Sequence, residues 1–325
     1  MKQIKSFLIR RFLQMIPLVL GITLLSFIVI NLAPGDFLDQ MRMNPDISRE
    51  IIDRLEAQYG LDQPLWRQYV NWLGSLLRFD LGYSFNYRVP VSFLIGSRLF
   101  NTFLLSLVSM LFGWIIAIPI GIHAAVKKYS ITDNVFTVFS FAGLSIPNFF
   151  LATILLFLVV RYGINLPIGG MTSIDYEWMS AGEKVIDLAR HMVIPVIALG
   201  TASMAGWMRQ MRGNLMDVLN KDFVKTARSK GLSERIVIYK HAVRNAINPL
   251  ITMFGFSLST LFSGAALTEA VTSWPGLGDL IIEAVMMRDY YLVMASLIMS
   301  SVMLIIGNLV ADIMLAFSDP RIRYN

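Results

Sequence analysis

The residues that most often carry catalysis are few in this chain and form no catalytic pattern. The three histidines, His123, His191 and His241, lie far apart and lack the short spacings of metal ligands. No cysteine is present, which excludes a thiol nucleophile, a thiolate metal site and a disulfide. The sequence also lacks a Gly-x-x-x-x-Gly-Lys-[Ser/Thr] phosphate loop, a His-Glu-x-x-His motif and a Gly-x-Ser-x-Gly motif. We therefore expect no catalytic residue and no metal site, and we expect that this chain is not an enzyme.

Charge and amphipathic periodicity are concentrated in residues 217–249, a polar interval that strongly hydrophobic segments bound on both sides. The pattern predicts two short helices, within residues 217–248, that are joined at Gly231. In the first helix, apolar residues share one face and cations another: Phe223, Val224 and Ala227 against Lys221, Lys225 and Arg228. Gly231 follows the basic last turn and therefore suits a left-handed C-cap.

The second helix of this segment is predicted to begin after Ser233, which can cap it, with Glu234 in its first turn. Its predicted apolar stripe is Ile236, Tyr239, Val243 and Ile247. Asn248 and Pro249 should end the helix, because the residue before a proline is disfavoured in the helical region. A small, basic, amphipathic helix pair beside a bilayer is suited to docking a partner. The alternative is a positively charged loop that only fixes topology.

The elements that must hold this segment are long apolar stretches. With 55% hydrophobic residues, 15% charged residues and a mean hydropathy of +0.60, the chain is unlike a soluble globular domain. Six stretches are long enough, or nearly so, to cross roughly 30 Å of hydrocarbon. They cover residues 12–33, 99–126, 135–160, 192–208, 249–267 and 291–317. We predict an all-α polytopic membrane protein with six transmembrane helices.

The placement of lysine and arginine predicts the orientation of these helices. Seventeen of the 28 cations lie in the two termini and in the second–third and fourth–fifth connections. The two shorter connections on the other side hold four, and the long first loop, which escapes the rule, holds seven. Both termini and residues 217–248 are therefore expected in the cytoplasm. The chain divides into a cytoplasmic N-terminus with the first transmembrane helix (1–33), an extracytoplasmic loop (34–98) and a core transmembrane domain (99–325).

The extracytoplasmic loop is predicted to contain two amphipathic helices. The first has Ile47, Ile51, Leu55 and Tyr59 on one face. Asp46 or Ser48 can cap its start, and Gly60 can end it. Pro64 begins the second helix, whose apolar face is Leu65, Tyr69, Trp72, Leu73 and Leu76. The aromatic residues of this helix suit the headgroup level of a bilayer, and a small cap that packs on its own core is the alternative.

Residues 222–232 (DFVKTARSKGL), followed by 241–246 (HAVRNA) and Pro249, resemble the coupling segment of ATP-binding-cassette importer permeases. They are most similar to the dipeptide/oligopeptide (peptide/nickel) branch of that family. The general family pattern begins Glu-Ala-Ala, with a glycine four residues after the second alanine. Here the triplet is Lys225-Thr226-Ala227 and Gly231 keeps that offset, and the peptide branch usually lacks the glutamate. The sequences YGLDQPL (59–65), DLGYS (80–84), WPGLG (274–278) and RDY (288–290) also resemble the family pattern.

The resemblance implies a type I importer permease fold, in which two permeases pair around a central path. It implies a second homologous permease, two ATPase subunits that bind ATP and Mg, and an extracytoplasmic substrate-binding protein. It also implies a prokaryotic cytoplasmic (inner) membrane and peptides as cargo, with nickel complexes or oligosaccharides left open. The residues it assigns to ATPase coupling are Lys221, Asp222, Phe223, Val224, Lys225, Thr226, Ala227, Arg228, Gly231 and Leu232.

A polar stripe on the fifth stretch is the predicted lining of the translocation path. It consists of Phe256, Ser259, Thr260 and Ser263. Such a stripe faces protein or water, because facing lipid would leave its hydroxyls unpaired, and a seam between helices is the competing interpretation. An ion-driven secondary transporter is a rival function, but the six stretches offer only one carboxylate, the off-centre Asp312. An intramembrane enzyme or scaffold is a second rival, which the missing catalytic motifs and the basic docking segment disfavour.

Overall fold

The computed structural model describes residues 2–32, 38, 42, 48–84, 86–259 and 266–318. Across these residues the chain is mainly helical and contains no β-strand. The longer helices are α1 (Lys2–Leu32), α5 (Val91–Val126), α6 (Ile131–Ser145), α7 (Asn148–Tyr162), α8 (Ala181–Leu219), α12 (Asn248–Ser259) and α15 (Tyr290–Ser318). The shorter ones are α3 (Arg49–Tyr59), α4 (Leu65–Leu77), η1 (Tyr176–Trp178), α9 (Asp222–Ser229), α10 (Glu234–Ile236), η2 (Val237–Val243), α11 (Arg244–Ala246), α13 (Ala266–Val271) and α14 (Leu277–Met286).

Three of the described helices are long and apolar enough to cross a membrane, namely α5, α8 and the part Tyr290–Val310 of α15. A bent pair formed by α6 and α7 adds a fourth span if the two helices count as one, and Ile16–Leu32 of α1 is a shorter apolar helix. The chain is therefore a helical, multi-pass membrane protein, as its composition predicts. The number of six spans stays a prediction.

The third predicted span, residues 135–160, is wrong as a continuous helix. The chain leaves the helical region at Ile146, with φ −89° and ψ 121°, and α6 and α7 meet at an angle of 106°. The cause is Pro147, because the ring of a proline crowds the preceding residue out of the α conformation. Pro147 then serves as the N-cap residue of α7.

The second and fourth predicted spans are shorter than the helices that form. Helix α5 begins at Val91, eight residues before the expected start, and α8 covers 39 residues from Ala181. A capping box starts α8: the Ser180 hydroxyl accepts from the N–H of Glu183, and the Glu183 carboxylate accepts from the N–H of Ser180. The sequence around residues 161–190 shows no regular period, so this early start was not predicted.

Helices α5 and α8 have the most extensive contact of any helix pair in the described chain, and glycines permit their close approach. A Cβ at Gly113 would lie 3.1 Å from the carbonyl oxygen of Gly200, and one at Gly121 would lie 2.7 Å from that of Met208. Gly143 of α6 faces α8 in the same way, 3.1 Å from Thr201. These glycines therefore serve helix packing, as small residues commonly do in membrane proteins.

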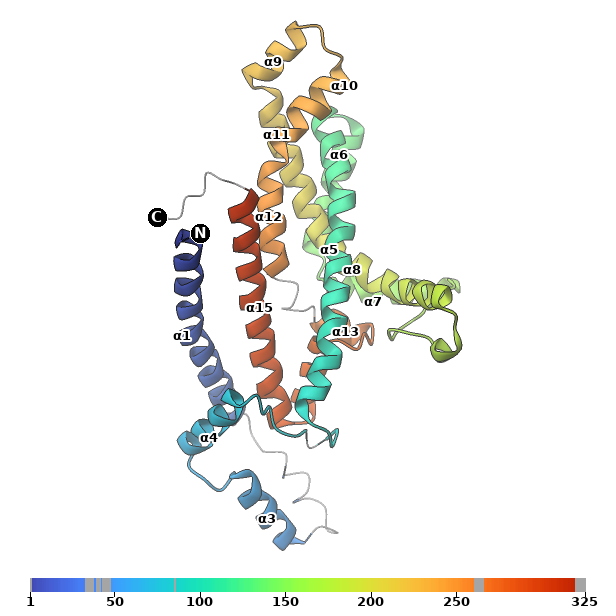
Figure 1. The fold of residues 1–325 in the computed structure, drawn as a ribbon. Coiled ribbons are helices and arrows are strands. Elements are labelled where there is room, and N and C mark those ends of the chain that lie inside the picture. Colours follow the sequence, from blue (N-terminus) through green and yellow to red (C-terminus); the bar gives the residue numbers. More distant parts are fainter. Residues whose placement is uncertain are drawn as a thin grey trace.

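The two ends of the molecule carry different short helices (Figure 1). Short helices α9 and α10 extend beyond one end, toward which the first residues of α1 also lie, and α3 and α4 lie at the opposite end. As predicted, α3 follows Ser48 and ends at Gly60 with φ +66°, and α4 follows Pro64. Trp72 of α4 is buried against Phe27 of α1 and Met294 of α15, so α4 packs on the long helices and not on a separate core.

Candidate functional site

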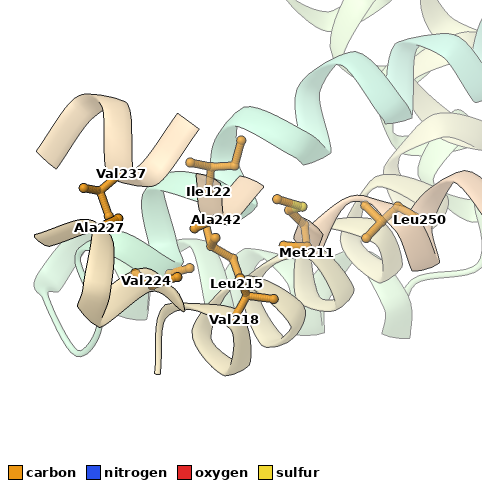
Figure 2. Close-up of a cluster of buried hydrophobic side chains, with 11 residues drawn as sticks. Ile122, Met211, Leu215, Val218, Val224, Ala227, Val237, Ala242 and Leu250 are labelled. Carbon is orange, nitrogen blue, oxygen red and sulfur yellow. The ribbon is translucent and has the colours of Figure 1, made fainter. Parts of the chain in front are cut away.

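The α9–α11 unit (residues 222–246) is anchored to the end of α8 by an apolar core (Figure 2). Val224 of α9 and Val237 of η2 are fully buried, and Leu215 and Val218 of α8 complete the contact. Ile122 and Ala125, at the end of α5, belong to the same cluster. A displacement of α9 should therefore also displace α8 and α5, because a close-packed interior transmits strain.

Gly231 makes the turn between the two parts of this unit, as predicted. Helix α9 ends at Ser229, and Gly231 has φ +75°, a conformation that costs non-glycine residues free energy. A Cβ there would meet nothing within 4 Å, so backbone conformation, and not space, favours glycine. Ser233 occupies the N-cap of α10, but its side chain makes no capping bond. An ion pair of 2.8 Å between Arg228 Nε and Glu234 Oε1 links the two parts instead.

The predicted apolar stripe of the second helix is wrong. Ile236 and Tyr239 are exposed, and Val243 and Ile247 are only partly buried. The residues that are buried are Val237, Ala242, Ala246 and Leu250. The reason is the π-helix η2, whose wider turn brings residues five apart onto one face, as Val237 and Ala242 are. The second helix ends at Ala246, two residues before the predicted end. Asn248 and Pro249 are nevertheless helical, since α12 begins at Asn248 and takes Pro249 into its first turn, where no N–H is needed.

The prediction that Phe223 shares one face with Val224 and Ala227 is also wrong, because Phe223 lies outside their buried face. Its side chain is 42% exposed, as expected for a residue one position, or about 100°, around the helix from Val224. The surface of the unit therefore presents four exposed apolar residues among cations. The apolar ones are Phe223, Leu232, Ile236 and Tyr239, and the cations include Lys225, Arg228 and Lys230, with the exposed Lys221 directly before the unit. Asp222 and Thr226 are also exposed, and Asp222 accepts from Lys225 Nζ at 2.9 Å.

Two polar contacts that the sequence did not reveal tie this unit and α6 to α8. Asp133 accepts two hydrogen bonds from the Arg212 guanidinium, at 2.7 and 2.8 Å, and its side chain is only 2% exposed. Asn214 Nδ2 donates to the carbonyl of Ala246 at 3.2 Å. The sequence does show that Asp133 lies three residues after Ser130, a pattern typical of a helix start. It does not show the partner of Asp133, because Arg212 lies 79 residues away.

The predicted path residues are not tested. The backbones of Phe256 and Ser259 belong to α12, but the structure does not describe their side chains. Thr260 and Ser263 lie outside the described residues. What the structure describes is that α12 packs along α15. The path assignment therefore stays a prediction.

A second candidate site is the Glu269 turn, which we define as residues 269–279 with Thr102 of α5. The Glu269 carboxylate, 1% exposed, accepts from the N–H groups of Gly278 (2.8 Å) and Asp279 (3.2 Å) and from the Thr102 hydroxyl (2.8 Å). The Thr102 oxygen in turn accepts from the N–H of Leu277. A carboxylate therefore satisfies the free N–H groups at the start of α14, which is where a negative charge is stabilised.

Close packing explains the glycines of this turn. A Cβ at Gly276 would lie 2.4 Å from the carboxyl carbon of Glu269, and one at Gly278 would lie 2.5 Å from the Cα of Ala266. Burial raises the pKa of Glu269 above its usual value, although its three hydrogen bonds act in the opposite direction. Burial and the nearby Glu283 also raise the pKa of Asp279, despite its ion pair of 3.3 Å with Arg98.

Two of the sequence motifs, 80–84 and 288–290, meet in space. Asp289, which is fully buried, accepts from the Ser84 hydroxyl at 2.5 Å and from the N–H of Asn86 at 3.2 Å. A Cβ at Gly82 would lie 2.8 Å from the ring of Tyr291. Periodicity within either segment could not show this contact, which joins residues about 200 positions apart.

Two of the three histidines, His123 and His191, take part in local side-chain hydrogen bonds. His191 Nδ1 lies 2.9 Å from the main-chain oxygen of Asp187, and His123 Nε2 lies 3.2 Å from the Thr132 hydroxyl. Within the described part of the chain, no three histidine, aspartate or glutamate residues gather as metal ligands would.

Comparison with known proteins finds two family models that together match nearly the whole chain. Residues 117–324 match the binding-protein-dependent transport system inner membrane component, and residues 4–107 match the N-terminal part of such membrane components. The oligopeptide transport system permease protein AppB of Bacillus subtilis is 42% identical over 323 residues, or 98% of this chain and 99% of that protein. The dipeptide transport system permease protein DppB of Escherichia coli K12 is 36% identical over 335 residues, with the same coverage. The glutathione transport system permease protein GsiC of Escherichia coli is 33% identical over 319 residues, or 98% of this chain and 99% of that protein.

Proposed function

The chain belongs to the family of binding-protein-dependent transport system inner membrane components, and we propose that it is a permease subunit of an ATP-driven peptide importer. The relatives named as oligopeptide and dipeptide permeases support this proposal, since they match over almost their full length. The relative named for glutathione also carries a small peptide, by its name. Nickel complexes and oligosaccharides are the alternative cargoes, and no observation on this chain favours them.

The proposed assembly has two permeases, two ATPase subunits that bind ATP and Mg, and an extracytoplasmic binding protein. The proposed topology has six transmembrane helices with both termini in the cytoplasm. Two observations support it: cations gather in the termini and in residues 209–244, and the first residues of α1 lie toward the same end as the α9–α11 unit (Figure 1). The α3–α4 region is then on the extracytoplasmic side of the membrane.

The observation that carries the proposed mechanism is the division of the α9–α11 unit into a buried and an exposed face. Its buried face joins Val224 to Leu215 of α8 and Ile122 of α5, so a push on α9 moves two long helices together. Its exposed face offers Phe223 and Tyr239 among cations, which fits a partner groove with apolar pockets and acidic residues. We propose that this face docks on an ATPase subunit and that the buried face transmits the movement.

The proposed path lies along α12, and the polar stripe of the sequence supports it. Hydroxyl groups can hydrogen bond weakly to a polar solute without the free-energy cost of a buried charge. In that arrangement selection is left to the binding protein, and the permease need not bind tightly.

The experiment that tests the function is purification with native partners, followed by reconstitution in vesicles. We expect stoichiometric ATPase subunits and uptake of a labelled dipeptide or oligopeptide that requires both ATP and the binding protein. Uptake driven by an ion gradient, without ATPase subunits, would contradict the proposal and establish the secondary transporter.

The topology has its own test, because the native chain has no cysteine. A cysteine introduced at Ser229, an exposed residue, should resist an impermeant thiol reagent in intact cells and react after lysis. A cysteine at Arg67 of α4 serves as the matched exposed control, which should react in intact cells. The reverse pattern would overturn the orientation.

A further inference from the structure

An apolar groove of about 340 Å³ runs between α1 and α4. Leu24, Ile28 and Leu32 of α1 form one wall, and Leu65, Trp66 and Val70 of α4 form the other. All six side chains are between 42% and 77% exposed. Phe27 and Tyr69, which also line the groove, are in edge-to-face contact, with ring centroids 5.3 Å apart.

The chemistry of the walls selects an apolar occupant. The lining contains no charged side chain, and its amide and hydroxyl groups, on Asn31 and Tyr69, make hydrogen bonds inside the protein. Asn31 Nδ2 donates to the carbonyl of Phe27 at 2.8 Å, and the Tyr69 hydroxyl lies 3.0 Å from that of Thr23. A peptide or an ion would lose its hydration without compensation there, whereas a hydrocarbon chain loses nothing by entering.

The position of the groove and the cation that follows Trp66 in α4 point to a lipid. The groove lies along the last part of the apolar stretch Ile16–Leu32, at the end of α1 remote from its first residues (Figure 1). Trp66 is 69% exposed, as aromatic residues at a membrane interface commonly are. The next residue, Arg67, is exposed and is the only charged residue of α4, so its guanidinium is complementary to a phosphate headgroup.

We propose that this groove holds one phospholipid of the outer leaflet, with an acyl chain between α1 and α4 and an anionic headgroup on Arg67. The inference rests on the proposed function for the orientation of α1, but it assigns the groove a structural ligand that is not cargo. Such a lipid would hold α4 against α1 by filling the space between their exposed apolar walls. It would therefore remain bound when the surrounding bilayer is exchanged for detergent.

The test is native mass spectrometry of the purified importer complex in detergent, counting retained phospholipids. The wild type should retain a phosphatidylglycerol that Val70→Trp loses, because the larger side chain fills the groove. Val185→Trp is the matched control, since Val185 of α8 is similarly exposed and lies far from the groove, and it should retain the lipid. Arg67→Glu should exchange phosphatidylglycerol for a zwitterionic lipid. Equal lipid counts in the wild type and in Val70→Trp would overturn the proposal.

A fluorescence measurement identifies the occupant. In nanodiscs that contain brominated phosphatidylglycerol, the signal of Trp66, taken as wild type minus Trp66→Phe, should be quenched in the full complex. An unquenched signal would mean that a protein covers the groove, and quenching without a retained lipid would mean bulk bilayer contact only; either result contradicts the site. Peptide uptake by the same preparation is measured separately. Its failure with the lipid retained would refute the proposed function and leave this inference standing.

Discussion

The α9–α11 unit and the Glu269 turn hold their shape by opposite means. In the α9–α11 unit, aliphatic side chains are buried and the charged groups lie in water. In the Glu269 turn, a carboxylate is buried and three hydrogen bonds satisfy it, with glycines packed against it. A buried polar network has no tolerance for a missing partner, whereas an apolar anchor with a wet surface tolerates surface change. The Glu269 turn is therefore suited to fixing geometry, and the α9–α11 unit to presenting a docking surface whose residues can be changed.

The largest effect should come from Gly276→Ala in the Glu269 turn. The added Cβ would lie 2.4 Å from the Glu269 carboxyl carbon, and moving that carboxylate breaks its bonds to α14. Overpacking costs about 1–3 kcal/mol, and each unsatisfied buried group adds about 1–3 kcal/mol. We expect a large fall in the melting temperature of the purified protein.

The matched control for this change is Gly74→Ala in α4, where an added Cβ meets nothing within 4 Å. That variant should melt at or slightly above the wild-type temperature, because alanine favours a helix over glycine. A Gly276→Ala protein that melts like the control would refute the contrast in packing.

Gly231→Val should have an intermediate effect on stability and a large effect on transport. A branched residue at φ +75° costs roughly 1–2 kcal/mol, and the turn that sets α9 against η2 would shift. We expect a membrane-inserted protein without peptide uptake. Gly231→Asn is the control, because asparagine tolerates the left-handed region, and it should retain most uptake. Wild-type uptake from Gly231→Val would mean that this turn does not position the docking face.

The pH dependence of the melting temperature should reveal the contribution of Glu269 to stability. Since burial raises the pKa of Glu269 in the folded protein, the folded state binds its proton more readily than the unfolded state. Its contribution to stability is therefore complete below its unfolded pKa, about 4.3, and is lost as pH rises through its folded pKa. Relative to Glu269→Gln, the wild type should gain melting temperature as the pH falls. Asp279 also has a raised pKa, but it is present in both proteins, so the comparison reports mainly on Glu269. A wild-type melting temperature that stays constant or falls, relative to that of Glu269→Gln, as the pH is lowered would contradict this.

The smallest effect on stability should come from Phe223→Ser and Tyr239→Ser on the exposed face of the α9–α11 unit. Both side chains are exposed, by 42% and 58%, so the change in folding free energy should be within about 0.5 kcal/mol. Binding to the ATPase subunits should nevertheless weaken, because exposed aromatic residues often anchor interfaces. Val224→Ser is the contrasting variant, since Val224 is fully buried and should lose stability. Unchanged co-purification of ATPase subunits with both surface variants would remove this face from the docking site.

The sequence alone determined the elements that depend on local or compositional properties. Apolar content set the membrane class, and the caps at Gly60, Pro64 and Gly231 follow from backbone preferences that neighbouring residues do not override. The family followed from short motifs in a fixed order, and the two matching family models confirm it.

Tertiary structure decided what depends on period changes and on distant partners. The π-turn of η2 put Val237 and Ala242, five residues apart, on the buried face, because its turn is wider than that of an α-helix. Pro147 bent one predicted span into two helices. Asp133 with Arg212, Ser84 with Asp289, and Glu269 with Thr102 are joined across 79 to 205 residues. Their pairing is invisible in the sequence, because a hydrogen bond depends on atoms that meet in space, and only the packing of the long helices brings these atoms together.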